Sequence, residues 1–423
     1  MKAGAVRAEI TPPAGLHMAG FGARTEPARG AHDPLYVRAL VLEGSQGCAA
    51  LVAADLIHVP EHIQDEVIRA VSARTPIGRE QIQLVGTHTH GGPAVIPGSE
   101  YSAALAAAMA DAVVQAWEQR REALAGVSTG TVGGIGKNRR HPEGPVDHDV
   151  TVLRIDDTAG RGIATLVNYS CHPTTLGPDN LLYTADYPGV ACAEIDREAE
   201  GIAIFTTGAQ GDVNPGGYSA EGSMIGHVVP WRNYQSAEQY GKAVARVALE
   251  VRGRLRPEPG DRVWGRSRVL ELSRKELPSA AEAQQRMEAA REAVLKAQAS
   301  GTREELTTAQ LAYGYAQVTL HQAKAPDRDQ PVRVRVSALA LGPATHVGIA
   351  GELFAELGMQ IKRAVGQGAT FVAVLSDGSI GYIPTRQAFA EGGYEPAASV
   401  LLPGGGEAIT EAAIGLATGP EKG

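Results

Sequence analysis

Two histidines two residues apart are the side chains of this chain best suited to do chemistry. His88 and His90 follow an apolar, strand-like segment from Ile82 to Val85. Because side chains alternate along a strand, both histidines are expected to project to the same side if the extended conformation continues. Neutral imidazole is a common zinc ligand, so the pair offers one metal ligand with a base beside it. The alternative is a pair of hydrogen-bonded structural histidines.

The elements that must position these histidines alternate between strand and helix over the first half of the chain. Hydrophobic periodicity predicts strands at Gly47–Asp55 and Gln81–Gly86, and helices at Pro60–Ser72 and Tyr101–Leu124. Period-2 runs then predict antiparallel strands at Asp149–Ile155 and Gly162–Val167, before further strands at Gly201–Thr206, Pro331–Leu339 and His346–Ala350. The fold class is therefore predicted as α/β (mixed α+β), with a mixed β-sheet core flanked by helices.

A helical insertion interrupts the second half. Ser279–Ser300 and Arg303–Lys324 are rich in Ala, Glu, Gln and Lys around a Gly301-Thr302 break, which predicts a helical hairpin over residues 278–325. Three roles are open: a lid, a homo-oligomer contact, and a solvated pair of helices packing on its own domain, which is favoured. Without repeats or Pro/Ser-rich linkers, the simplest organisation is one domain over residues 1–423.

Composition narrows the class of protein. The chain has 423 residues, 43% of them hydrophobic, and a formal net charge of −8. That negative charge argues against a nucleic-acid-binding surface and does not favour binding to anionic lipid headgroups. No apolar run is long enough to span a bilayer, and the first residues lack the apolar core of a signal peptide. Three widely spaced cysteines fit a reducing compartment, so a cytoplasmic location is expected; they are Cys48, Cys171 and Cys192.

Polar residues also gather in loops after other predicted strands. His172 follows the strand that ends near Val167, and Glu352 opens a predicted helix over Leu353–Val365. A turn histidine and a carboxylate that opposes the helix dipole are the plain alternatives. The glycine-rich loop Gly208–Gly217 can approach a ligand closely but lacks the lysine and spacing of a phosphate loop.

In their order along the chain, these pieces resemble the catalytic domain of the neutral, or alkaline non-lysosomal, ceramidases. The N-terminal match comprises Ile10-Thr11-Pro12, Met18-Ala19-Gly20-Phe21-Gly22 and Asp33-Pro34-Leu35-Tyr36-Val37-Arg38-Ala39. It continues with Ala54-Asp55-Leu56, the histidine run, Asn138-Arg139 and Gly211-Asp212-Val213. The strongest single match is the spacing of Tyr382 and Tyr394, because the family carries a metal-binding and a catalytic tyrosine at the same separation.

The resemblance implies a role for each of these side chains. His88, His172, Glu352 and Tyr382 would be the protein ligands of one zinc ion per chain, which activates water. His90 would be the general base, and later the proton donor to the leaving amine. Tyr394 and Arg139 would face the developing oxyanion. Arg139 is preferred over the adjacent Arg140 because it follows Asn138 as in the family, and Asp212 is expected to hold its loop.

Two departures from the family pattern bear on the substrate. Where ceramidases have a serine after Gly-Asp-Val, this chain has Asn214, which cannot act as a nucleophile but can bind substrate. The sequence given also leaves no room for the family's C-terminal immunoglobulin-like domain. We therefore expect a zinc-dependent amidohydrolase acting on an N-acyl compound, ceramide-like or smaller. The alternatives are a zinc-dependent ester or lactone hydrolase and a non-catalytic ligand-binding relative.

Overall fold

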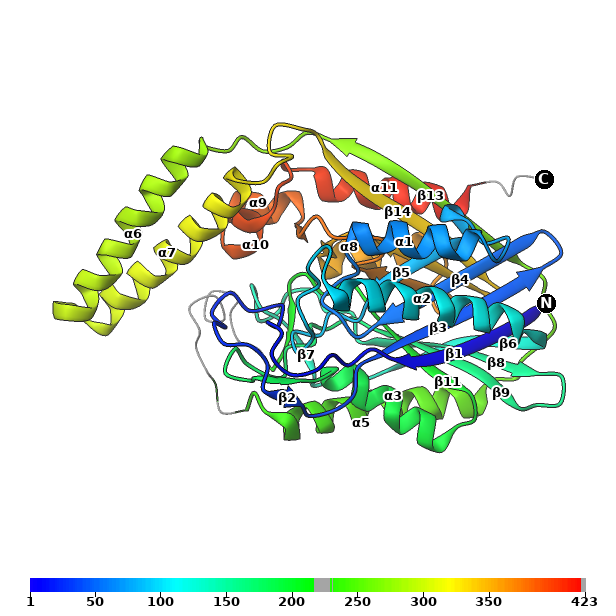
Figure 1. Ribbon diagram of the computed structural model, residues 1–423. Coiled ribbons are helices and arrows are strands. Elements are labelled where there is room, and N and C mark those ends of the chain that lie inside the picture. Colours follow the sequence, from blue (N-terminus) through cyan, green and yellow to red (C-terminus); the bar gives the residue numbers. More distant parts are fainter. Residues whose placement is uncertain (217–228, 230, 420–423) are drawn as a thin grey trace.

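A large mixed sheet forms the centre of the fold (Figure 1). The computed structural model describes residues 1–216, 229 and 231–419. Strands β11–β9 and β4–β5 pair in parallel, and the other neighbours are antiparallel. In spatial order the strands are β11 (Ile202–Thr207), β9 (Gly162–Tyr169), β8 (Asp149–Asp157), β6 (Arg121–Thr131), β1 (Lys2–Glu9), β3 (Tyr36–Gly44), β4 (Gly47–Ala54) and β5 (Ile82–Gly86). The predicted mixed sheet is confirmed.

A second sheet of four strands packs on one face of the first. Buried side chains from both sheets, among them Leu40 and Leu51 from one and Leu339 and Phe371 from the other, form a common apolar layer. Its strands are, in spatial order, β13 (Val263–Leu272), β14 (Val332–Leu341), β15 (Ala344–Ile349) and β17 (Thr370–Val374). Burial of these apolar faces against each other supplies a large part of the driving force for folding.

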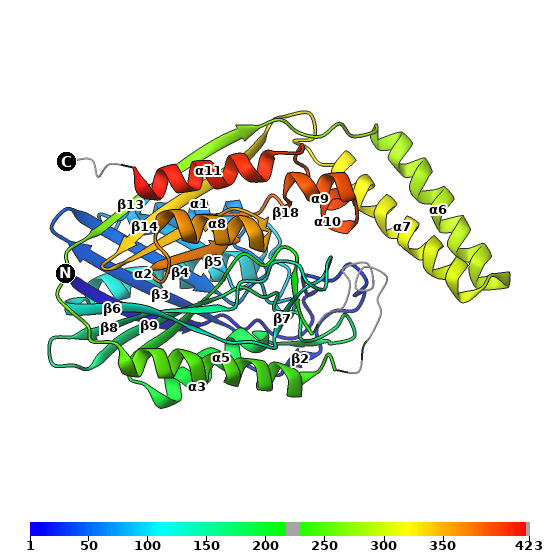
Figure 2. The same cartoon turned by 180° about the vertical axis from the view of Figure 1, so that it is seen from behind.

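Helices cover the two outer faces (Figures 1 and 2), as predicted. On the large sheet lie α1 (Glu61–Ser72), α2 (Glu100–Glu118), α3 (Asp186–Glu198) and α5 (Tyr234–Arg254). On the small sheet lie α8 (Ala355–Val365) and α11 (Gly405–Thr418). The spacing explains α1: Ile63, Val67 and Val71 recur every four residues and are buried on one stripe. The result is four layers, helix on sheet on sheet on helix.

The helical hairpin projects from the end of the body opposite the N-terminus and the last turn of α11 (Figure 1). It consists of α6 (Ala280–Ser300) and α7 (Arg303–Ala323), and each helix begins with a capping box, Ser279 with Glu282 and Thr302 with Glu305. The whole excursion leaves from β13 and returns into β14, and these two strands are paired side by side from Leu272↔Val332 onward.

Short elements line the same end of the sheets. They are the strand pairs β2 (Gly30–Ala31) with β10 (Leu182–Tyr183), β7 (Gly136–Asn138) with β12 (Val213–Pro215) and β16 (Glu352–Leu353) with β18 (Tyr382–Ile383), and the helices α9 (Arg386–Glu391) and α10 (Tyr394–Ala398). A 3₁₀ turn at Arg79–Gln81 precedes β5, at the other end of that strand. No helix of the described residues is both long and apolar enough to pass through a bilayer.

One predicted helix end was wrong. The helix predicted over Tyr101–Leu124 ends at Glu118, and residues from Arg121 onward form β6. Alanine and glutamate in Glu122-Ala123-Leu124 favour a helix locally. Pairing of this segment with β8 and with the first residues of β1 outweighs that local preference, which is a tertiary effect that periodicity does not report.

Candidate active site

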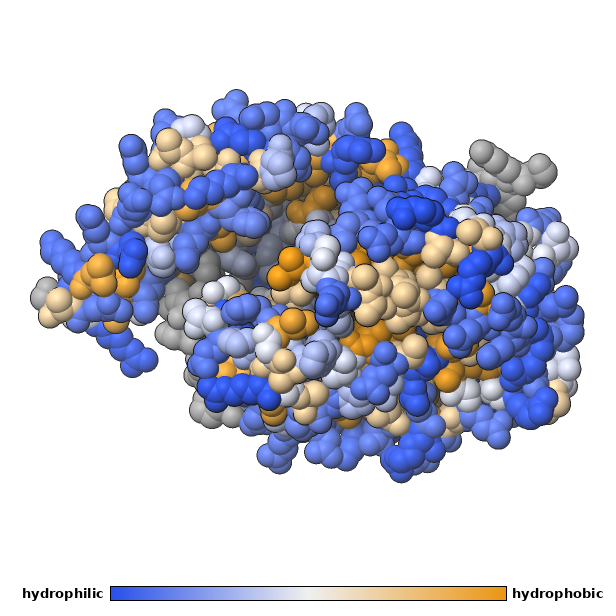
Figure 3. All heavy atoms as spheres, viewed as in Figure 1, coloured by the Kyte–Doolittle hydropathy of each residue, from blue (hydrophilic) through white to orange (hydrophobic). Residues whose placement is uncertain are grey.

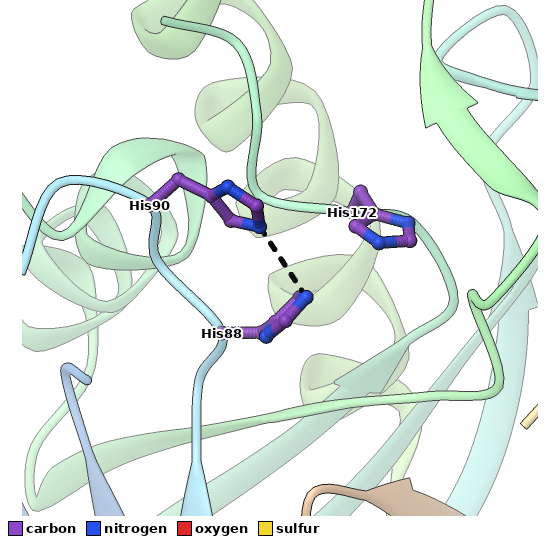
Figure 4. A group of neighbouring side chains, drawn as sticks. All are labelled: His88, His90 and His172. Carbon is purple, nitrogen blue, oxygen red and sulfur yellow. Dashed lines mark hydrogen bonds between the residues drawn. The ribbon is translucent and has the colours of Figure 1, made fainter. Parts of the chain in front are cut away.

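Three histidines meet where the strands of the large sheet end (Figure 4). His88 and His90 lie in the loop after β5, and His172 lies in the loop after β9. The prediction that an extended strand continues through His88 was wrong, because His88 has a left-handed backbone (φ 67°). The turn still brings both rings to one point: the Nε2 atoms of His88 and His90 are 3.4 Å apart.

Glu352 completes a compact set of donor atoms. Its Oε2 lies 3.0 Å from His172 Nε2 and 3.5 Å from His88 Nε2. The two zinc–nitrogen bonds of a tetrahedral site, each about 2.0 to 2.1 Å long, place their ligand atoms about 3.3 to 3.4 Å apart. The separations among these atoms are therefore those of ligands around one small cation. All three residues are buried.

The hydrogen bonds of the outer ring nitrogens show which way the lone pairs point. His88 Nδ1 lies 2.9 Å from the Ile57 carbonyl oxygen, and His172 Nδ1 lies 3.0 Å from that of Val213. A carbonyl only accepts, so each Nδ1 must carry the proton and donate it. In the neutral ring Nε2 is then a bare lone pair, directed at the Glu352 carboxylate. Three Lewis-basic atoms converging in a buried site fit a bound cation.

The electrostatics agree with that protonation state. Burial, with Arg139 nearby, lowers the pKa of His172 to about 4, so its ring is neutral at neutral pH. Burial and the neighbouring His88 and His172 hold the pKa of His90 well below its ordinary value. Burial opposes ionisation of Glu352, but positive charge at the positions of His88 and His172 would lower its pKa well below the ordinary value, and a bound cation would supply such charge. Neutral imidazoles beside an ionised carboxylate are the forms that ligate metals.

Glu352 and Tyr382 are brought together by a short parallel strand pair. Glu352 of β16 lies opposite Tyr382 of β18. The prediction that Glu352 sits in the first turn of a helix was wrong, because α8 begins only at Ala355 with Phe354 as its N-cap. Burial raises the pKa of the Tyr382 phenol well above its ordinary value, with a further contribution from Glu352. The two residues thus reach one site from positions 30 residues apart.

Arg139 and Arg140 differ in the hydrogen-bond partners of their guanidinium groups. A buried carboxylate, Glu395, accepts from both: Arg139 Nε at 2.7 Å and Arg140 Nη1 at 2.7 Å. Arg140 also donates to the Gly392 carbonyl at 2.7 Å, whereas Arg139 donates to Asn214 Oδ1 at 3.0 Å and lies over the Tyr382 ring. Nη2 of Arg139 is buried and, within the described part of the chain, has no hydrogen-bond partner. Arg139 is therefore the one with a donor to offer.

The second tyrosine begins a short helix beside the first. Tyr394 is the first residue of α10, after Gly393 with a backbone φ of 95° that favours glycine. The rings of Tyr382 and Tyr394 are 5.5 Å apart in an edge-to-face arrangement. Burial raises the pKa of the Tyr394 phenol, so it keeps its proton and can donate a hydrogen bond.

Asp212 joins two of the elements that carry these side chains. Its carboxylate accepts from Asn138 Nδ2 at 2.7 Å and from the Ala355 backbone N–H at 2.8 Å. It thereby ties the segment before Arg139 to the start of α8, next to Glu352. Burial raises the pKa of Asp212 to about 6 even though these hydrogen bonds oppose the shift.

Other contacts around the site were not predicted from the sequence. Gly20 lies so close to His90 that a Cβ there would stand 2.6 Å from the ring, and the Phe21 ring packs on His90 at 4.7 Å. Arg24 donates to the His90 carbonyl at 3.0 Å. Glu395, which clamps both arginines, was also missed. The Gly20-Phe21 pair stood out in the sequence, but nothing there assigned it to His90.

The site opens on a cavity of about 730 Å³. His90, His172, Arg139 and both tyrosines line one side of it, and the loop around Phe21 lines another. The far wall comes from the hairpin, mainly from α7. The hollow between the hairpin and the body is visible in Figure 3. The site is thus a cluster of histidine, arginine and tyrosine side chains at the base of a cavity of the size that holds small organic ligands.

Comparison with known proteins supports the resemblance. Residues 1–130 match the family model described as neutral/alkaline non-lysosomal ceramidase, N-terminal. The neutral ceramidase of Drosophila pseudoobscura pseudoobscura is 26% identical over 254 residues, which cover 51% of this chain and 36% of that protein. Neutral ceramidase A of Dictyostelium discoideum is 26% identical over 249 residues, covering 49% and 35%. The matched part thus spans about a third of these relatives' length.

A solved structure shares the fold over most of the chain. The neutral ceramidase from Pseudomonas aeruginosa superposes with a TM-score of 0.74 at 18% identity, covering 98% of this chain and 74% of that one. The resemblance drawn from the sequence is confirmed: the chain is ceramidase-like and has the neutral ceramidase fold.

Proposed function

We propose that this chain is a zinc-dependent hydrolase that cleaves the linear amide bond of an N-acyl compound. The observation that carries the proposal is the convergence of His88 Nε2, His172 Nε2 and Glu352 Oε2, with both outer histidine nitrogens committed to backbone carbonyls. Tyr382, opposite Glu352 in the strand pair, would be the fourth protein ligand. When bound, zinc would supply Lewis acidity and bring the pKa of a water to about 7.

His90 is assigned as the base rather than as a ligand. Its Nε2 is close enough to the cluster to ligate, since the ligand nitrogens of the three histidines lie within 4.8 Å of one another. A metal-bound histidine, however, almost always donates its other N–H. His88 and His172 do so, whereas His90 Nδ1 is buried without a partner among the described residues. His90 would take the proton of the attacking water and return it to the leaving nitrogen.

Arg139 and Tyr394 would stabilise the charge that develops on the carbonyl oxygen. Arg139 has its Nη2 unused within the described residues, and Glu395 fixes the orientation of its guanidinium. Tyr394 holds a phenol proton at neutral pH. Donors oriented in advance toward an oxyanion in a buried site commonly contribute the largest share of catalysis. Asn214, hydrogen-bonded to Arg139, would help to place the substrate.

The test combines metal content with turnover. Purified wild type, His88→Ala and His32→Ala, an exposed histidine away from the cavity, are analysed by plasma mass spectrometry and assayed on matched N-acyl amides and esters. We expect about one zinc in the wild type and His32→Ala, none in His88→Ala, and amide hydrolysis only where zinc is present. Hydrolysis confined to esters would replace the amidase by an esterase. Zinc-loaded protein inert on both panels would leave a binding protein.

A further inference from the structure

A second cavity, of about 710 Å³, lies between the base of the hairpin and the start of α1. Strands β13 and β14, the segment after α7 and the loop before β18 complete its walls. Among its described lining residues there is no proposed metal ligand and none of the residues assigned to hydrolysis. Four residues line both cavities, namely His321, Gln322, Gly381 and Ala398. The second cavity is therefore a separate candidate site, of a size that holds small molecules.

Arginine is the most frequent charged residue in the walls of this second cavity. Three of its four arginines have a carboxylate partner, in the pairs Arg79–Asp65, Arg274–Asp327 and Arg333–Glu271. The fourth, Arg335 of β14, differs from them. No carboxylate of the described residues lies within salt-bridge distance of it.

Arg335 is half-buried and makes few contacts through its charged group. Its Nη1 donates to Ser267 Oγ at 3.2 Å, which is the only hydrogen bond of its side chain to the described residues. Burial lowers the pKa of its guanidinium, because a charged group loses hydration there. Arg79 and Arg333 are near enough to lower this pKa further by repulsion. An arginine in such surroundings is stabilised by an anion that accepts from its remaining N–H groups.

Two carboxylates in the walls, Asp377 and Glu61, favour the charged form of Arg335, but neither pairs with it. Glu61 is exposed to solvent at the start of α1. Asp377 is buried, and the body already occupies its carboxylate: Oδ1 accepts from the Leu84 N–H at 3.1 Å, and Oδ2 accepts from Ser337 Oγ at 2.9 Å. Moving this carboxylate toward Arg335 would break both bonds and leave their donors unpaired. The charge of Arg335 is thus left for a ligand.

We propose that the second cavity binds a small molecule through a carboxylate or phosphate group held by Arg335. The planar guanidinium presents N–H donors in pairs, which match two oxygens of either group. Arg79 and Arg333 add positive charge near it. This ligand is distinct from the substrate of the proposed hydrolysis. Because Gly381 lines both cavities and directly precedes Tyr382, the ligand would lie beside the segment that carries a proposed metal ligand.

Two anions and matched arginine variants test this site. Calorimetry with inorganic phosphate and with succinate, at equal ionic strength, measures binding, and glycerol is the uncharged control. Arg335→Gln removes the charge from the cavity, and Arg268→Gln makes the same change at an exposed position of β13 outside it. Arg335→Lys keeps the charge but loses the paired donors. Thermal unfolding shows whether each variant is folded.

We expect at least one of the two anions to bind the wild type, and to bind Arg335→Gln about 10- to 100-fold more weakly, the loss of a hydrogen bond to a charged group. Arg268→Gln should bind like the wild type, and Arg335→Lys should lie between them. The anion that binds more tightly identifies the group that the cavity takes. The proposal would be overturned if neither anion bound, if Arg335→Gln kept the wild-type affinity, or if Arg268→Gln lost as much. Should Arg335→Gln not fold, an unchanged affinity in Arg335→Lys would overturn it.

The same measurement separates this site from the proposed hydrolase, because calorimetry needs no turnover. Arg335-dependent binding in a protein that is inert on N-acyl amides would keep the second site and remove the hydrolase. Amide hydrolysis without Arg335-dependent binding would keep the hydrolase and remove the second site.

Discussion

The two sides of the cavity at the candidate active site are built in different ways. Behind one side, His88, His172 and Glu352 are 3%, 1% and 9% exposed, and Nδ1 of each histidine is fixed by a hydrogen bond to a backbone carbonyl. On the other side, α7 belongs to a hairpin whose residues are mostly exposed or half-buried. Bond making needs atoms held within a few tenths of an ångström, and this requires a packed surrounding. Selecting a substrate needs only a surface that fits part of it.

The largest expected effects come from two histidine variants, which distinguish a metal ligand from a general base. His172→Ala should lose the metal and nearly all turnover, because it removes a proposed ligand whose orientation the Val213 carbonyl fixes. His90→Ala should keep the metal and lose about 10²- to 10⁴-fold in kcat, the range for a general base. Metal content and kcat are measured on both variants. Equal metal loss would make His90 a third histidine ligand and would remove the division of labour.

A smaller loss is expected from a single oxyanion donor. Tyr394→Phe should retain its metal and lower kcat by about 10²- to 10³-fold, the effect of removing one such donor. Steady-state kinetics with one N-acyl amide measure it, and Tyr101→Phe, at a tyrosine outside the cavity, is the control. An unchanged kcat would exclude Tyr394 from the reaction.

Asp212, which links elements of the buried side, makes the free energy of unfolding depend on pH. Burial raises the pKa of Asp212 to about 6 in the folded protein, above the ordinary aspartate value of about 3.9. Between pH 4 and 6 the folded state therefore binds more protons than the unfolded one, and Asp212 lowers the free energy of unfolding as pH rises through this window. The change attributable to Asp212 should be as much as about 3 kcal/mol.

Denaturant unfolding of wild type and Asp212→Asn at pH 4 and pH 7 measures that change. The free energy of unfolding at pH 7 minus that at pH 4 should be more positive in Asp212→Asn than in wild type, by as much as about 3 kcal/mol, and should equal wild type in Asp329→Asn at an exposed aspartate. Equal pH dependence in Asp212→Asn and wild type would show that Asp212 stays ionised in the folded protein throughout this range.

The smallest effect is expected on the exposed side. Ser279 caps α6 through a capping box with Glu282, and Ser279→Ala should cost about 1 kcal/mol of local stability. Hydrogen exchange over the first turn of α6 should speed up about fivefold, with metal content and kcat unchanged. Metal loss in this variant would contradict the separation of the two regions.

The sequence predicted the layers of the fold better than their stacking. Alternating and amphipathic patterns found most strands and helices because burial imposes these periods. The pairing of β13 with β14 across the hairpin, and the packing of Leu51 against residues of a second sheet, depend on contacts between distant segments. Local pattern carries no information about such contacts, and the same limit produced the error at Glu118.

For the site, the family resemblance supplied the set of side chains, and the structure supplied their geometry. The Nδ1 partners of His88 and His172 are the backbone carbonyls of Ile57 and Val213, which any residue type could provide. The left-handed turn at His88 was not predicted either, because histidine, although enriched at positive φ, has negative φ at most of its positions. Glu395 was missed because its role depends on contacts with Arg139 and Arg140, which are about 255 residues away in the sequence.

The place where the hairpin leaves the body bears on how such a protein can evolve. The chain departs from β13 at Leu272 and re-enters β14 at Val332, and these two residues are direct neighbours in the small sheet. Closing a loop costs only slowly more as the loop grows. Residues 273–331 can therefore be lengthened, shortened or exchanged in a lineage without shifting a core strand. The buried cluster of the body and the wall that faces it can then change independently within one gene.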